Sequence, residues 1–108
     1  MPREDRRVIF DRNESYQAIY TLAQKQDNMQ RPMPGAITKI EEDAEDPNKI
    51  NFYITNPQTD ENKVAVYTRD FVAASLMMFC RGAGIPLPRK ASKSVIVKNN
   101  ELILRALV

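Results

Sequence analysis

The sequence predicts an α+β fold: a two-layer domain built from a duplicated β-α-β-β unit, with two helices and a mostly antiparallel sheet. Residues 7–54 and 63–107 each contain, in the same order, a short apolar strand, a helix, a Pro-x-Pro segment and two further strands. Self-similarity of this kind indicates an internal repeat. The matching landmarks are Val8-Ile9-Phe10 with Val64-Ala65-Val66, Arg12-Asn13 with Arg69-Asp70, and Arg31-Pro32-Met33-Pro34 with Ile85-Pro86-Leu87-Pro88.

The length and composition of the chain predict one domain, residues 1–108. A chain of 108 residues is long enough to bury a core without disulfides or metal. Hydrophobic residues make up 43% and charged residues 28% of the sequence, which is typical of a globular protein. We therefore treat the two repeats as halves of a single domain.

The first repeat begins with a strand at residues 7–10 and a helix that Asp11 or Asn13 can cap. An apolar face at helical spacing follows, and Pro32 and Pro34 prevent further helix. Strands are expected at residues 36–40 and 50–55, on either side of an acidic turn. The residues of the expected apolar helix face are Tyr16, Ile19, Tyr20 and Ala23.

The second repeat begins after a polar loop at residues 56–62. A strand at residues 64–68 leads into a helix that Thr68 or Asp70 can cap and that runs to about Gly82. Two strands around Asn99-Asn100 form a hairpin, because asparagine tolerates the positive φ angles of a two-residue turn.

The helix of the second repeat is apolar on nearly every side between residues 71 and 80. Such a helix is buried all round, and a domain of this size has difficulty enclosing one helix completely. We therefore predict a two-fold homodimer through this helix. The alternative is a central helix that both sheets of the same chain enclose. The expected interface residues are Phe71, Leu76, Met77, Met78 and Phe79.

Several classes of catalytic and metal site are excluded by composition. The chain has no histidine and one cysteine, Cys80, so neither a His-dependent triad nor a zinc site with imidazole or clustered thiolate ligands can be built. The acidic residues 41–46 lack the spaced ligands and turn glycine of a calcium loop, and we interpret them as a solvated turn. We expect no metal, no cofactor and no catalytic residues, and hence a protein that is not an enzyme.

The charge of the chain is divided unevenly between its two halves. Residues 1–62 carry 8 basic and 12 acidic side chains, a net −4, whereas residues 63–108 carry 8 basic and 2 acidic side chains, a net +6. This asymmetry indicates either a surface that meets an acidic partner or two halves that complement each other. The predicted binding surface for a protein partner or nucleic acid comprises Arg81, Arg89, Lys90, Lys93 and Lys98.

These observations predict a small non-catalytic interaction or regulatory protein that binds a protein partner through the basic surface. The alternative is a nucleic-acid-binding module that uses the same surface. The absence of aromatic residues after Phe79 weakens that alternative, because single-stranded bases stack on aromatic rings. The lone cysteine and the charged first residues lead us to expect a cytoplasmic protein without membrane contact.

Overall fold

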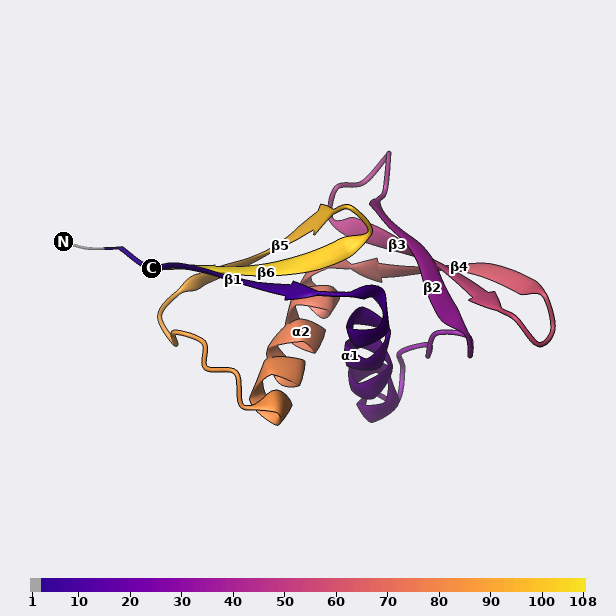
Figure 1. Ribbon diagram of the computed structural model, residues 1–108, viewed down its shortest axis with the longest axis horizontal. Helices are drawn as coiled ribbons and strands as arrows, with labels where there is room; N and C mark the ends of the chain where they lie inside the picture. Colours follow the sequence, from indigo (N-terminus) through magenta and orange to yellow (C-terminus); the bar gives the residue numbers. More distant parts are fainter. Residues whose placement is uncertain (1–2) are drawn as a thin grey trace.

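The computed structural model describes residues 3–108 and confirms an α+β fold with two helices and six strands (Figure 1). Met1 and Pro2 of the charged N-terminal segment lie outside the described residues. The elements are β1 (Asp5–Phe10), α1 (Arg12–Lys25), β2 (Ala36–Glu42), β3 (Lys49–Asn56), β4 (Glu61–Thr68), α2 (Arg69–Ala83), β5 (Ser92–Lys98) and β6 (Glu101–Leu107).

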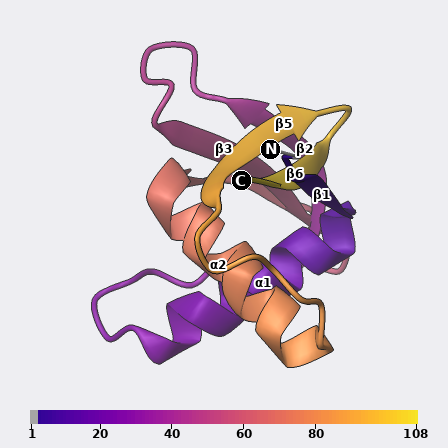
Figure 2. The same cartoon turned by 90° about the vertical axis from the view of Figure 1, so that its left-hand side faces the viewer.

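The strands form two three-stranded antiparallel sheets, ordered β1-β6-β5 and β2-β3-β4. Each sheet combines strands from both predicted repeats. The first strand of each repeat pairs with the last strand of the other, so that Phe10 lies opposite Leu102 and Lys49 lies opposite Thr68. Both helices lie on the same side of the strands (Figure 2). The predicted sheet is therefore antiparallel but divided in two, with strands exchanged between the repeats.

Two arginines at equivalent positions support the predicted duplication. Arg12 and Arg69 are the first residues of α1 and α2. Nη1 of Arg12 donates a hydrogen bond to the carbonyl oxygen of Thr38 in β2 at 3.4 Å, and Nη1 of Arg69 donates to that of Val95 in β5. Each arginine lies 26 residues before its acceptor. The two halves thus share a tertiary hydrogen bond as well as an order of elements.

The helices begin at caps that the sequence analysis anticipated. The Asp11 side chain accepts a hydrogen bond from the backbone N–H of Glu14 at 2.8 Å, and the Glu14 carboxylate accepts from that of Asp11 at 3.0 Å, forming a capping box. The Thr68 hydroxyl caps α2 by accepting from the N–H of Phe71. Asp11 and Thr68 are therefore equivalent positions, which aligns Phe10 with Tyr67. The predicted landmarks align Phe10 with Val66, one residue earlier.

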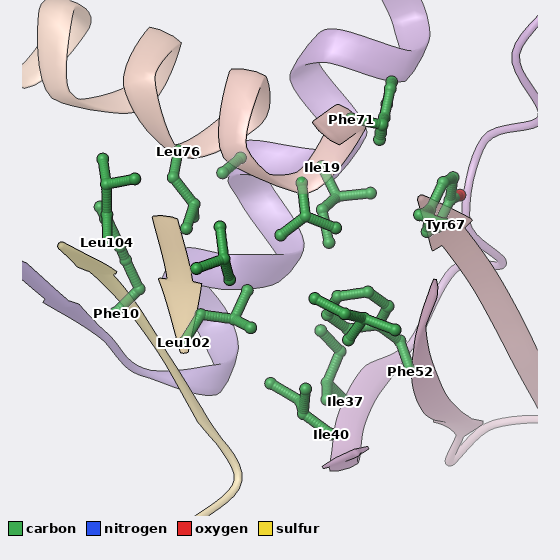
Figure 3. Packing of buried hydrophobic residues seen from close by; sticks show 14 of the residues in the cluster. Phe10, Ile19, Ile37, Ile40, Phe52, Tyr67, Phe71, Leu76, Leu102 and Leu104 are labelled. Atoms are coloured by element: carbon green, nitrogen blue, oxygen red, sulfur yellow. The ribbon is translucent and has the colours of Figure 1, made fainter. Parts of the chain in front are cut away.

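The core lies between the helices and the two sheets (Figure 3). From β1 and β6 it receives Phe10, Leu102 and Leu104, and from β3 it receives Phe52. On α1 the buried positions are Ser15, Ala18, Ile19 and Ala23, whereas Tyr16 and Tyr20 are only half-buried. The buried face of α1 is thus rotated relative to the predicted face.

Helix α2 packs against α1 and against strands of both sheets. Phe71 is 7% exposed and Leu76 is 0% exposed, so these two residues of the expected dimer interface lie in the core of their own chain. Met77, Met78 and Phe79 are half-buried, and the Phe79 ring makes an edge-to-face contact with Phe10 at 5.5 Å between centroids. The same chain thus encloses part of this helix, as the alternative interpretation expects, and the dimer stays a prediction.

No helix within the described part of the chain has the length and apolar character needed to span a membrane. The final hairpin turns at Asn99 and Asn100, whose φ angles are 53° and 58°. Both values lie in the left-handed region that the two-residue turn requires, as the sequence analysis predicted.

Candidate functional site

A groove lies between the end of α2 and the chain that leads from α2 to β5. Its volume is about 550 Å³. Three cationic side chains and an apolar floor line it, and we call it the basic groove. Its lining residues are Met77 and Arg81 of α2, Ile85 to Arg89 of the connection, and Lys93 of β5.

The basic groove is formed because α2 ends sharply and the chain then runs extended. Gly84 adopts a left-handed conformation with φ 73°, which terminates the helix, and the N–H of Ile85 donates to the carbonyl oxygen of Cys80 at 2.8 Å. Pro86 and Pro88 then disfavour helix and stiffen the connection. Nη1 of Arg6 in β1 donates to the carbonyl oxygen of Pro86 at 3.0 Å and fastens the connection to the sheet.

The electrostatic character of the basic groove is uniformly positive. Arg81, Arg89 and Lys93 line it, and no carboxylate does. Within residues 3–108 none of these three side chains takes part in an ion pair. Arg81 also lies in the last turn of α2, where the negative end of the helix dipole favours a cation. An anionic group entering the groove would therefore meet cations that are not already neutralised.

The structure brings together only some of the predicted binding residues. Arg81, Arg89 and Lys93 line the same groove. Lys90 is exposed in the turn before β5 and does not line it. Lys98 lies at the opposite end of β5, across from Glu101 at the hairpin turn. The predicted surface is thus a compact cluster of three cations with two outlying lysines.

Arg6 is a further cation near the basic groove that the sequence analysis did not single out. It lies in a cross-strand row with Ala106 and Lys93, and residues in such a row share one face of the sheet. Ala106 is fully buried, so this face is directed toward the helices. In the sequence, the alternation of Arg6, Val8 and Phe10 indicates that these three side chains share one face of a strand. That Arg6 lies near Lys93 follows only from the pairing of β6 with both β1 and β5.

The lining of the basic groove is suited to binding an anionic ligand. Its residues provide no carboxylate, hydroxyl or thiol, and its ionisable side chains are those of Arg81, Arg89 and Lys93. The partly exposed side chains of Met77, Ile85 and Leu87 provide an apolar floor beneath the cations. This combination fits an anionic ligand that also carries an apolar group.

A second groove, of about 520 Å³, lies between β4 and the connection from α1 to β2. We call it the β4 groove. Its lining includes Tyr20, Met33 and Val64 together with the cations Arg31 and Lys63. It resembles the basic groove in position, because each contains the Pro-x-Pro segment of one repeat. It has two cationic side chains where the basic groove has three, and more of its lining is apolar, so the two grooves differ in chemistry.

Two tyrosine hydroxyls fix the position of the connection between α1 and β2, which forms one side of the β4 groove. The Tyr16 hydroxyl donates to the carbonyl oxygen of Met33 at 3.0 Å, and the Tyr67 hydroxyl donates to that of Gln30 at 2.8 Å. Burial raises the pKa of Tyr67 to about 12, so its phenol remains a hydrogen-bond donor at neutral pH.

The acidic turn is organised by its own backbone. The Asp43 carboxylate accepts hydrogen bonds from the N–H groups of Glu45 and Asp46 at 2.9 and 3.2 Å, which lowers the pKa of Asp43. Within residues 3–108 no group of three or more histidine, cysteine, aspartate or glutamate side chains is arranged to hold a metal ion. Cys80 is buried, and this burial raises the pKa of its thiol.

Comparison with models of known protein families, with curated proteins and with solved structures finds no match to this chain.

Proposed function

We propose that this protein is a small non-catalytic interaction protein whose basic groove binds an acidic segment of a partner protein. The observation that supports this proposal is the groove itself: Arg81, Arg89 and Lys93 surround an apolar floor, with no carboxylate among the lining residues. Charge complementarity of this kind guides association and selects partners of the opposite sign.

An acidic polypeptide suits the basic groove better than nucleic acid does. The side chains beneath the cations are Met77, Ile85 and Leu87, which can receive an aliphatic or aromatic side chain of a peptide. No aromatic ring lines the groove, whereas proteins that bind single strands stack bases on such rings. Nucleic-acid binding through the same cations remains the second candidate, because unpaired arginine and lysine side chains also attract phosphates.

The proposal is tested by measuring the affinity of two fluorescent probes at low and moderate salt. One probe is a decapeptide of alternating glutamate and leucine, and the other is a mixed-sequence single-stranded oligonucleotide. The test variant R89E/K93E reverses two cations in the groove. The control variant K90E/K98E changes the net charge by the same amount outside the groove.

We expect the peptide to bind the wild-type protein and K90E/K98E similarly, and to bind R89E/K93E at least about tenfold more weakly, since losing close charge pairs costs 1.4 kcal/mol or more. Equal loss in both variants would show a response to net charge alone and would contradict a specific groove. Stronger binding of the oligonucleotide, falling steeply with salt, would replace the proposal with the nucleic-acid alternative.

We also propose that the protein is cytoplasmic and forms a homodimer. Its only cysteine is free and buried, which is compatible with a reducing compartment. Helix α2 can supply little of a dimer interface, because Phe71 and Leu76 are enclosed in the core and Met77, Met78 and Phe79 are half-buried. A dimer therefore requires another surface.

A further inference from the structure

Strand β4 forms an edge of its sheet and leaves hydrophobic side chains in water. Within residues 3–108, β3 is the only strand that pairs with it. Val64 is 50% exposed and Val66 is 49% exposed, and the two lie on the same face of the strand. The strand is eight residues long and contains neither proline nor a register shift.

The other three edges carry features that discourage pairing with another strand. Strand β1 is charged at Asp5, Arg6 and Arg7. Strand β2 has a register shift between Ile37 and Lys39. The carbonyl oxygen of Val95 in β5 accepts a hydrogen bond from the Arg69 guanidinium. Charges, bulges and side-chain cover are the means by which proteins protect sheet edges, and of these β4 has only the charges of Glu61 and Lys63, within its first three residues.

We propose that β4 pairs with β4 of a second copy of this chain, joining two three-stranded sheets into one of six strands. The pairing is antiparallel and centred on Ala65, which lies opposite the partner's Ala65. Val64 then lies opposite the partner's Val66, and the reverse contact follows from the two-fold symmetry. Each exposed valine then contacts a valine of the partner strand on the same face of the sheet.

The sequence of β4 favours this register over those centred on Lys63 or Val64. Opposite residues share a face in an antiparallel pair, so only registers that match outer positions with outer positions keep the two sheets continuous. Centring the pair on Lys63 would bring two like charges together. Centring it on Val64 would place Val66 opposite the partner's Asn62. When the pair is centred on Ala65, Lys63 lies opposite the partner's Tyr67, and no two like charges lie opposite each other.

A second copy suits this edge better than an unrelated strand, because residues 62–68 complement themselves in this register. The interaction is also closed: once β4 of each copy is paired, no further copy can add at that edge. A foreign strand at β4 is the competing possibility, and it predicts a protein that does not self-associate when pure.

The first test compares two double variants by sedimentation velocity from low to high micromolar concentration. V64K/V66K places like charges opposite each other at both symmetry-related contacts. V64E/V66K alters the same two positions but places opposite charges there. We expect V64K/V66K to raise the dimer dissociation constant by roughly tenfold or more relative to V64E/V66K, since cross-strand charge pairs change sign. Circular dichroism and thermal melts establish that both variants fold.

Equal dissociation constants for the two variants would overturn the proposed register. A wild-type protein that stays monomeric over the whole concentration range would overturn the dimer and leave the edge to a foreign strand. Reversal of Arg89 and Lys93 in the basic groove is expected to leave self-association unchanged, so failure of the proposed function does not affect this test.

The second test is a disulfide at the symmetry axis. Opposite residues of an antiparallel pair have Cα atoms roughly 4.5 to 5.5 Å apart, within the range that a disulfide spans. Mild oxidation should therefore convert A65C into a covalent dimer. The control I9C introduces a thiol at a position that is 59% exposed on β1, outside the β4 pairing, and it should form no covalent dimer. Equal cross-linking of both variants would contradict pairing through β4.

Discussion

At the scale of single residues, Gly35 occupies a position that only glycine fits, because its backbone approaches the backbone of Thr55 closely. Its φ angle is +150°, and a Cβ atom at this position would lie 2.4 Å from the carbonyl oxygen of Thr55 in β3. The residue ends the connection from α1 and lets β2 begin alongside β3. Both the backbone conformation and the close approach therefore require glycine.

We predict that Gly35→Ala lowers the free energy of unfolding by about 2 kcal/mol or more, because the backbone conformation is strained for alanine and the carbonyl of Thr55 must move. Gly82→Ala is the matched control, since nothing lies within 4 Å of a Cβ atom there and the residue is helical. That change should stabilise the protein by roughly 0.5 to 1 kcal/mol. Urea unfolding of both variants measures the difference, and equal stabilities would contradict the packing at Gly35.

Features that depend on neighbouring residues could be predicted from the sequence. Asp11 and Thr68 were among the expected helix caps, and Asn99-Asn100 was expected to form the hairpin turn, because each acts on backbone groups close to it in the chain. Gly35 and Arg6 were not singled out. Their roles depend on Thr55 and Pro86, which lie far away in sequence and come near only through strand pairing.

At the scale of elements, α2 shows that a chain of this size can bury much of an apolar helix in its own core. Its apolar character was visible in the sequence, but the surfaces that cover it were not. Helix α1 and strands of both sheets pack against it, and they bury Phe71, Val72 and Leu76 to 7% exposure or less. A small domain can enclose one helix when two sheets contribute to the cover. The choice between these alternatives therefore required the strand order.

Arg69, at the start of α2, makes side-chain interactions that link the two sheets. The Arg69 guanidinium donates to the carbonyl oxygen of Val95 in one sheet, while Nε donates to that of Pro47 at 3.0 Å and Nη2 lies 2.9 Å from the Glu42 carboxylate at the end of the other. Its side chain is 25% exposed. Hydrogen bonds to a partly buried charge stabilise more than those at an exposed surface.

We predict that Arg69→Ala lowers the free energy of unfolding by about 2 to 3 kcal/mol, because three interactions between the sheets are lost together. Arg12→Ala is the natural control. It removes the equivalent residue of the first repeat, which is exposed and makes one hydrogen bond at 3.4 Å, so the expected loss is about 0.5 kcal/mol or less. Thermal and urea unfolding distinguish the two. A larger effect at Arg12 would contradict the role assigned to Arg69.

At the scale of the whole molecule, the matching order of elements in the two halves places two grooves of different chemistry at corresponding connections. The basic groove lies along the connection of the second repeat and the β4 groove along that of the first. The basic groove carries the positive charge of the second half, whereas the edge beside the β4 groove carries exposed valines. The proposed partner segment and the proposed second copy thus bind at different surfaces of the protein. Substitutions at one surface are expected to leave binding at the other unchanged.

Strand exchange makes each repeat depend on the other for a complete sheet. Strand β1 of the first repeat pairs only with β6 among the described strands, and β4 of the second repeat pairs only with β3. A repeat in isolation retains one hairpin and one helix but leaves its first strand unpaired. It also exposes the core face that the other helix covers, and two-stranded hairpins are marginally stable in water.

We predict that fragments 1–58 and 59–108, divided in the exposed turn between β3 and β4, do not fold separately but fold when mixed in equal amounts. Mixing restores both exchanged strand pairs and the contact between α1 and α2, so helical and strand signals in circular dichroism should rise together with a cooperative thermal transition. A fragment beginning at residue 11 instead of residue 1 is the control: without β1 it should complement far less well, because β6 loses its neighbour. A single fragment that folds cooperatively as a monomer would show that the exchanged strands are dispensable, since that fragment would have completed its sheet without them.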